Sequence, residues 1–131
     1  MSENQKKQAA SVKLLLIDDE KAFANIVAKR MSKRNIDVTQ AYSGTEALQA
    51  LRKADFDVAI LDLKMEDMNG IEVLRILKKM DPDLGVIMLT GHGSEEAARE
   101  GIKLGAIDYL TKPCDFEELV AKIKKIPKRK R

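Results

Sequence analysis

Acidic, hydroxyl and basic side chains follow short apolar runs of this sequence, at the points where those runs end. Two acids come directly after the run at residues 12–17, and a single polar residue ends or follows each of three later runs. The five residues are Asp18, Asp19, Asp62, Thr90 and Lys112. If the runs are parallel strands, their carboxyl ends meet at one edge of a sheet, which is where open α/β sheets bind ligands. We therefore expect these side chains to share one site.

Three of these side chains are carboxylates, and they repel one another when they are brought together. At about 5 Å and an effective dielectric near 20, each pair costs roughly 3 kcal/mol. A hard divalent cation compensates this repulsion, and Mg²⁺ typically takes one or two carboxylates together with phosphate oxygens. Asp18, Asp19 and Asp62 therefore predict a Mg²⁺ site rather than a closed Ca²⁺ cage.

Lys112 adds an ammonium group to this set, and Thr90 adds a hydroxyl donor. Phosphoryl transfer needs a nucleophile and stabilisation of the charge on the equatorial phosphoryl oxygens. A carboxylate nucleophile, a metal ion, an ammonium group and a hydroxyl group supply both requirements. The pattern predicts phosphoryl-transfer chemistry.

The elements that must position this site alternate between apolar runs and amphipathic stretches. Several of the runs are continuous, as strands buried on both faces of a parallel sheet require, and we expect strands at 12–17, 36–41, 58–61, 86–89 and 107–110. Ser43 and Asp115 each precede a glutamate by three positions, which is a signal for a helix start. The alternation predicts a doubly wound α/β fold with a five-stranded parallel sheet and five helices. Periodicity alone does not give the strand order.

Length and composition restrict the chain to one domain. It has 131 residues, of which 44% are hydrophobic and 34% charged, as in a globular protein. That length leaves no room for a separate catalytic or DNA-binding domain. We expect a polar N-terminal extension over 1–11, the folded domain over 12–126 and a basic tail over 127–131.

Hydropathy argues against a membrane segment and against secretion. The longest apolar runs have four residues, whereas a spanning helix needs about 20. The first eleven residues lack the apolar stretch of a secretory signal, and Cys114 is the only cysteine. We expect no membrane partner, a cytoplasmic location and an inert thiol at Cys114.

The formal net charge of +3 is concentrated at one end of the chain. Residues 124–131 hold six positive charges and no acid, which leaves 18 basic and 21 acidic residues elsewhere, a net charge of −3. A nucleic-acid-binding protein carries its positive excess on the folded surface. We therefore expect no specific nucleic-acid binding. The tail itself fits a solvated helix end, a linker, or a contact with nucleic acid or an anionic membrane.

Five features of the sequence, in the order in which they occur, resemble the receiver domain of response regulators over about residues 12–126. They are the acidic pair 18–19, the segment 62–70, the pair Thr90-Gly91, the segment 106–110 and the pair Lys112-Pro113. Each is weak alone, but together they coincide with the predicted strand ends. Glu66 and Asn69 depart from the family pattern, which usually has proline and often aspartate there. These departures bear on the stiffness of the loop, because neither position supplies a side chain to the chemistry.

The resemblance implies a flavodoxin-like fold with strand order 2-1-3-4-5 and a metal-assisted phosphoacceptor. Asp62 resembles the phosphoacceptor, Asp19 the main metal carboxylate and Asp18 its support. The backbone carbonyl of Lys64 would be a further metal ligand. The family's strand order places the three acids at the switch point between the first and third strands.

The resemblance also implies how the phosphoryl group would be held and sensed. Thr90 and Lys112 would contact the phosphoryl oxygens, and a cis Lys112-Pro113 bond would aim the ammonium group at Asp62. Tyr109 would be the aromatic residue whose position reports phosphorylation. Thr90 and Tyr109 would thus form the switch.

The partners implied by the resemblance are proteins. A sensor histidine kinase or a phosphotransfer protein would supply the phosphoryl group from a phosphohistidine. A downstream protein would bind the face from Ser94 to Ile126. The resemblance also allows a homodimer that forms on phosphorylation. The chain would promote its own phosphorylation and dephosphorylation without being a turnover enzyme. His92 and Lys64 would tune the access of water to the phosphoryl group.

Other functions fit parts of the pattern. A small Mg²⁺-dependent phosphohydrolase could use the same carboxylates through an aspartyl-phosphate intermediate, but dehalogenase-like enzymes place their paired acids two positions apart, whereas Asp18 and Asp19 are adjacent. An interaction module that is never phosphorylated would not need all five side chains. A flavin-binding module fits less well, because the acids would repel the flavin phosphate. Taken singly, Asp18, Asp19 and Thr90 also fit helix caps, and Tyr109 fits a core position.

Overall fold

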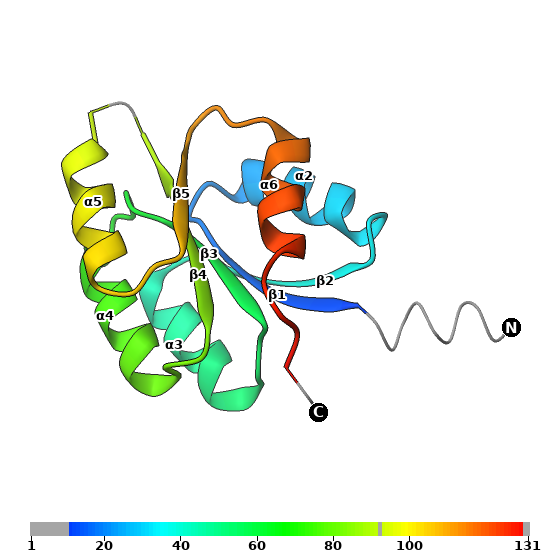
Figure 1. The fold of residues 1–131 in the computed structure, drawn as a ribbon, viewed down its shortest axis with the longest axis horizontal. Coiled ribbons are helices and arrows are strands. Elements are labelled where there is room, and N and C mark those ends of the chain that lie inside the picture. The colour runs from blue at the N-terminus through cyan, green and yellow to red at the C-terminus, as the bar shows by residue number, and fades with distance from the viewer. Residues whose placement is uncertain (1–10, 92, 130–131) are drawn as a thin grey trace, which may run out of the picture.

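The computed structural model describes residues 11–91 and 93–129, and within them five parallel strands form one sheet (Figure 1). The strands are β1 (Val12–Ile17), β2 (Ile36–Ala41), β3 (Val58–Asp62), β4 (Gly85–Thr90) and β5 (Asp108–Thr111). Their order in the sheet is β2-β1-β3-β4-β5. The predicted flavodoxin-like α/β fold is therefore confirmed.

The predicted strand bounds agree with the structure to within one residue at each end. β3 extends one residue further than predicted because Asp62 still pairs with Leu89 of the next strand. Thr90 likewise pairs with Thr111 and ends β4. Asp62 and Thr90 are thus the last residues of hydrogen-bonded strands, so the sheet itself fixes their backbones.

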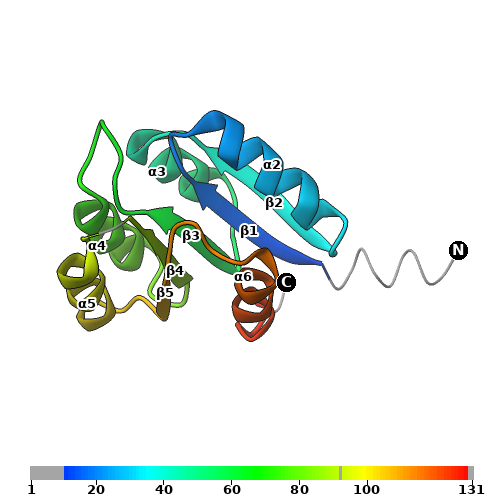
Figure 2. The same ribbon diagram turned by 90° about the horizontal axis from the view of Figure 1, so that it is seen from above.

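Helices cover both faces of the sheet (Figure 2). α2 (Lys21–Ser32) and α6 (Phe116–Lys124) pack on one face, and α3 (Gly44–Lys53), α4 (Gly70–Met80) and α5 (Glu95–Lys103) pack on the other. Leu14 and Leu16 face the first core and Leu15 and Ile17 the second, and all four are fully buried. The continuous apolar run of β1 thus reflects burial on both faces. No helix in the described part of the chain is long and apolar enough to span a membrane.

Polar side chains fix the starts of three helices. Ser43 and Asp115, both predicted as caps, accept hydrogen bonds from backbone amides three and two positions later, at 3.0 and 3.2 Å. Asn69 caps α4 in the same way, accepting from the amide two positions later at 2.8 Å. An asparagine side chain offers a capping oxygen as aspartate does. Asn69, where the family often has aspartate, therefore still fixes the start of α4.

The loop between β3 and α4 is closed and braced by its own residues. Lys64 and Asn69 form an isolated antiparallel bridge across it. A Cβ atom on Gly70 would lie 2.5 Å from the Leu63 Cα, so the two backbones approach too closely for any residue but glycine. Asp67 accepts hydrogen bonds from two backbone amides at the start of α3, at 3.1 and 3.3 Å. These contacts brace the loop although it has Glu66 where the family usually has proline.

The basic segment after α6 differs from a solvated helix end. The Arg129 side chain is only 22% exposed, and its guanidinium group forms an ion pair with Asp81. Residues 1–10 of the predicted N-terminal extension, and residues 130–131 of the predicted tail, lie outside the described residues. Arg129 therefore does not fit the solvated helix end that is one interpretation of the tail, because a partner distant in sequence binds its charge.

Candidate functional site

Three polar residues from different strand ends meet at the carboxyl edge of the sheet. Asp62 ends β3, Asp18 follows β1 and Lys112 follows β5. Asp18 and Asp62 are only 0% and 5% exposed. The Lys112 Nζ lies 2.8 Å from Asp18 Oδ2 and 3.6 Å from Asp62 Oδ2. The structure therefore brings these three predicted site residues together.

Lys112 is held from several sides. Its Nζ lies 3.0 Å from Glu20 Oε1 and 4.4 Å from the centre of the Phe23 ring. Its backbone amide donates a hydrogen bond to the Thr90 carbonyl at 2.7 Å, and its peptide bond to Pro113 is cis, as the resemblance implies. These contacts fix the ammonium group between two buried carboxylates.

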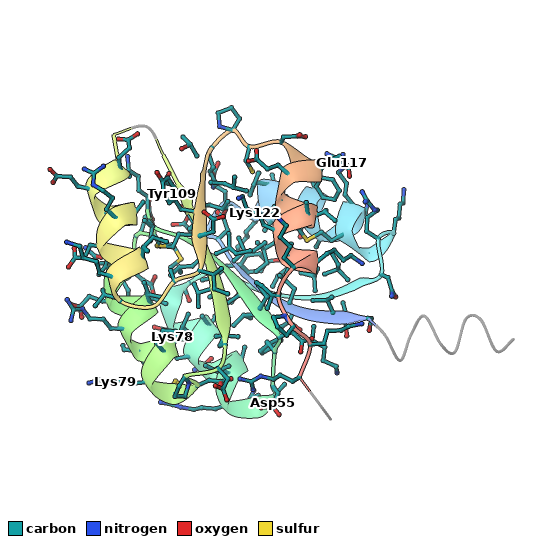
Figure 3. All side chains as sticks on the ribbon, in the orientation of Figure 1. Asp55, Lys78, Lys79, Tyr109, Glu117 and Lys122 are labelled. Atoms are coloured by element: carbon teal, nitrogen blue, oxygen red, sulfur yellow. The ribbon has the colours of Figure 1, made fainter. Side chains whose placement is uncertain are left out.

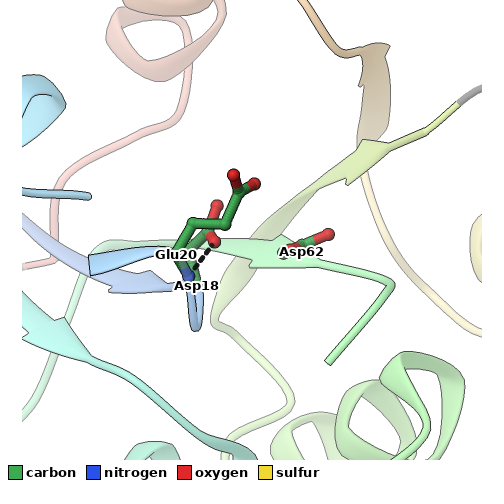
Figure 4. A group of neighbouring side chains, drawn as sticks. All are labelled: Asp18, Glu20 and Asp62. Carbon is green, nitrogen blue, oxygen red and sulfur yellow. Dashed lines mark hydrogen bonds between the residues drawn. The ribbon is translucent and has the colours of Figure 1, made fainter. Parts of the chain in front are cut away.

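Glu20 is the site residue that the sequence interpretation did not identify. One carboxylate oxygen from each of Asp18, Glu20 and Asp62 lies within 4.8 Å of the others (Figure 4). The Glu20 backbone amide also donates to Asp18 Oδ1 at 2.9 Å, which fixes the buried carboxylate. A third consecutive acid was the available signal, but acids at a helix start are common without a ligand.

Asp19 has a different partner from Asp18 and Glu20. Its Oδ2 accepts a hydrogen bond from the Glu66 backbone amide at 3.1 Å, and it is not in the group of three close carboxylates. Asp19 therefore links the turn after β1 to the loop after β3. Its predicted role as the main metal carboxylate stays a prediction.

Burial dominates the electrostatics of Asp62. Burial raises the pKa of Asp62 from 3.8 to about 6, and the charges of Asp18 and Asp19 add to the rise. The Lys64 backbone amide, which donates to Asp62 Oδ1 at 3.0 Å, and the Lys112 ammonium group oppose it. A carboxylate with this pKa is ionised at neutral pH and is more basic than an exposed aspartate.

Lys112 remains a cation in the same surroundings. Burial by itself lowers the pKa of Lys112, but its hydrogen bonds with Asp18 and Glu20 and the nearby charge of Asp62 outweigh this effect and raise the pKa to about 12. Lys112 therefore supplies a permanent positive charge beside Asp62 throughout the neutral pH range.

Among the described contacts, the side chains of the two predicted switch residues form no hydrogen bond with the acidic cluster. The Thr90 hydroxyl is buried and donates a long hydrogen bond, 3.4 Å, to the carbonyl of Leu110 on β5. Tyr109 is partly buried and packs against the core under α3, α4 and α5 (Figure 3). The Thr90 hydroxyl thus already contacts the strand that carries Tyr109.

Of the two further predicted positions, the structure describes Lys64 alone. Lys64 is exposed, and its Nζ lies 3.7 Å from the position that a Cβ atom on Gly91 would occupy. His92 lies outside the described residues.

Cys114 is a partly buried free thiol, and burial raises its pKa, so the thiol is less reactive than an exposed one.

The donor set fits a hard divalent cation. Two buried carboxylates and one exposed one converge, and they supply the oxygen ligands that Mg²⁺ prefers. Lys112 neutralises part of their charge in the structure. A cation at this place would relieve the repulsion that Lys112 leaves.

Comparison with known proteins identifies the family. The family model of the response regulator receiver domain matches residues 14–124. The transcriptional regulatory protein ZraR of Escherichia coli K12 is 35% identical to this chain over an aligned region of 115 residues. That region is 88% of this chain but only 26% of ZraR. The chain therefore corresponds to about a quarter of the length of that relative.

Solved structures agree with the family model. The receiver domain of Francisella response regulator 1452 superposes with a TM-score of 0.81 at 36% identity, covering 88% of this chain and 95% of that one. The Vibrio cholerae chemotaxis protein CheY4 gives a TM-score of 0.82 at 31% identity, covering 90% and 100%. With its acidic edge, its lysine and its strand order, the chain belongs to the receiver domain family of two-component response regulators.

Proposed function

We propose that this chain is the phosphoacceptor receiver of a two-component phosphorelay, with Asp62 as the acceptor and Mg²⁺ as the cofactor. The observation that carries the proposal is the position of the Lys112 ammonium group, between buried Asp18 and Asp62 at 2.8 and 3.6 Å. Family membership adds a histidine kinase or a phosphotransfer protein as the phosphoryl donor.

The reaction follows from the site. A carboxylate oxygen of Asp62 attacks the phosphorus atom of a phosphohistidine, a phosphorus–oxygen bond forms, and the phosphorus–nitrogen bond breaks with its electrons remaining on the histidine ring. Lys112 stabilises the charge on the equatorial phosphoryl oxygens. Mg²⁺, held by Asp18, Asp19, Asp62 and the Lys64 carbonyl with Glu20 nearby, would neutralise charge on the carboxylates and the phosphoryl group.

The switch would involve Thr90 and Tyr109. A new phosphoryl group on Asp62 offers the Thr90 hydroxyl a charged acceptor, which is stronger than its present 3.4 Å contact with the Leu110 carbonyl. Rotation of that hydroxyl would vacate space beside β5 and let Tyr109 move inward. This motion links the chemistry to the face from Ser94 to Ile126.

That face has the character of a protein-binding surface. Ile102 and Ile107 are 40% and 55% exposed, which is high for large apolar side chains. Next to Ile107, an ion pair joins Asp108 and Lys122 at 2.6 Å. We assign this face to a downstream protein, and a homodimer formed on phosphorylation would use the same surface.

Intact-mass analysis tests the proposal. The parent chain should gain one phosphoryl group from a small phosphodonor in the presence of Mg²⁺ and none in chelator, because the clustered carboxylates repel an anionic donor until a cation bridges them. Asp62→Asn should abolish the gain, and Asp37→Asn, at an exposed position on β2, should leave it unchanged. Modification that persists in chelator or in the Asp62 variant would refute the assignment.

A further inference from the structure

The segment after α6 passes the amino-terminal end of the sheet (Figure 1). It contacts Asp57, just before β3, whereas Asp62 is the last residue of that strand. Ile126 is 8% exposed and packs beside Gly85, where a Cβ atom would lie 3.0 Å from the Ile126 Cγ2. Three residues later, the backbone amide of Arg129 donates a hydrogen bond to Asp57 Oδ1 at 2.7 Å. The chain is thus attached to the sheet beyond the end of its last helix.

The Arg129 side chain is bound as well as its backbone. One guanidinium nitrogen forms a close ion pair with Asp81 Oδ1, and another lies 3.8 Å from Asp55 Oδ1. The side chains of Arg129 and Asp81 are only 22% and 15% exposed. The hydrogen bond with Asp81 raises the pKa of Arg129 further, and Asp83 adds a nearby negative charge.

The carboxylates that receive Arg129 are held by other parts of the fold. Asp57 is 1% exposed, and its Oδ2 accepts a hydrogen bond from the Lys13 backbone amide at 2.8 Å. The Asp57 amide in turn donates to the Lys13 carbonyl at 2.8 Å. Asp81 accepts from the Asp83 amide at 3.2 Å in the turn before β4. Contacts within the body of the domain therefore support both acceptors.

We propose that Asp55 and Asp81 form an arginine-binding site at the amino-terminal edge of the sheet, that Asp57 holds the backbone of its occupant, and that this occupant is Arg129 of the segment after α6. This clamp, defined as Arg129 with these three aspartates, fixes the path of the chain after α6. Figure 3 shows Asp55 at the end of the domain where the segment after α6 runs, far from Tyr109, and the Arg129 guanidinium group lies 3.8 Å from its carboxylate.

The clamp also shapes one surface feature. A small pocket on the face of β5 and α6 is lined in part by Ile107, Ile126 and Pro127. Only Pro127 and Lys128 separate Ile126 from Arg129. Immobilising Arg129 therefore restricts the backbone of Ile126, and the fixed φ angle of Pro127 restricts it further. The clamp would therefore hold one wall of this pocket. The relevance of the pocket to output rests on the proposed function, whereas the clamp itself does not.

Amide hydrogen exchange on the full chain tests the clamp. The amide of residue 129 should be protected in the parent, and Arg129→Gln should increase its exchange rate about 10- to 100-fold, as expected for loss of a charge-assisted hydrogen bond. Lys125→Gln makes the same charge change at an exposed position just after α6 and should change that rate by less than about twofold. An unprotected amide in the parent, or equal effects of the two variants, would overturn the proposal.

Coupling between the partners gives a second measurement. If Arg129 and Asp81 act as a pair, the effects of Arg129→Gln and Asp81→Asn on exchange at residue 129 should not add in the double variant. Additive effects would show that the pair is not the clamp. The methyl signals of Ile107 and Ile126 should shift in Arg129→Gln, and unchanged signals would refute the role in the pocket wall. Asp62 phosphorylation, measured in the same variant, should be unchanged and reports separately on the proposed function.

Discussion

Lys112 lies closer to Asp18 than to Asp62: its Nζ is 2.8 Å from the Asp18 carboxylate and 3.6 Å from the Asp62 carboxylate. Asp18 is therefore paired with a cation within the protein. Asp19 instead accepts a hydrogen bond only from a neutral backbone amide among the contacts that the structure describes. The two adjacent acids thus differ in how much charge they offer to a metal ion.

This difference predicts different effects on Mg²⁺ affinity. Asp19→Asn should weaken Mg²⁺ binding about 10- to 100-fold, the cost typical of disturbing a metal site, and Asp18→Asn should weaken it less. Glu20→Gln should also have the smaller effect, because Glu20 is exposed and paired with Lys112. Titration calorimetry of the three variants with Mg²⁺ measures the order. Equal affinities in all variants and the parent would mean that the acids are not metal ligands.

Asp62→Asn should stabilise the metal-free protein at neutral pH. The pKa of Asp62 is about 6 in the folded state and 3.8 ordinarily, so the folded state favours the protonated form. The stability of the parent relative to the variant is therefore greatest below about pH 4 and is lost as pH rises through 6. A shift of two units corresponds to about 3 kcal/mol, and solvent screening of a site open at one side reduces this to about 1–2 kcal/mol.

Urea unfolding in chelator measures this effect. The variant should be more stable than the parent at pH 7.5 and equally stable at pH 4. Saturating Mg²⁺ should reverse the order at pH 7.5, because the cation stabilises only a protein that binds it. A variant that is no more stable than the parent at pH 7.5 without metal would contradict the effect of burial on Asp62.

Thr90→Ala should separate phosphorylation from the switch. The hydroxyl donates its hydrogen bond to the Leu110 carbonyl and not to Asp62, so the variant should still accept a phosphoryl group. Moving a two-state equilibrium from 1:99 to 99:1 takes about 5.5 kcal/mol, and charge-assisted hydrogen bonds supply roughly 1.5–3 kcal/mol each. Loss of one such bond should reduce the phosphorylation-dependent NMR shifts around Tyr109. A shift pattern identical to that of the parent would rule out the coupling.

The sequence predicts the parts of this protein that local patterns determine. Apolar runs locate every strand to within one residue, and the polar residues at their ends locate Asp18, Asp62 and Lys112. The missed contacts depend on tertiary structure. Glu20 joins the site because its side chain turns toward Lys112, and Asp57 meets Arg129 across 72 positions of sequence. No periodicity or capping signal reports such a pair.

The clamp lowers the positive charge that the segment after α6 can offer to nucleic acid. If the six charges of residues 124–131 bound DNA, the affinity would fall with salt with a slope of up to about −5 on logarithmic axes. The charge of Arg129 is instead compensated by Asp81, and the rest of the chain carries a net charge of −3 that repels phosphate. We therefore expect no specific DNA binding in anisotropy titrations at about 0.15 M salt. Ending the chain at Ile126 should leave Asp62 phosphorylation intact, because Arg129 lies at the opposite edge of the sheet. A tight, sequence-selective DNA complex, or loss of phosphorylation in the shortened chain, would contradict this assignment of the tail.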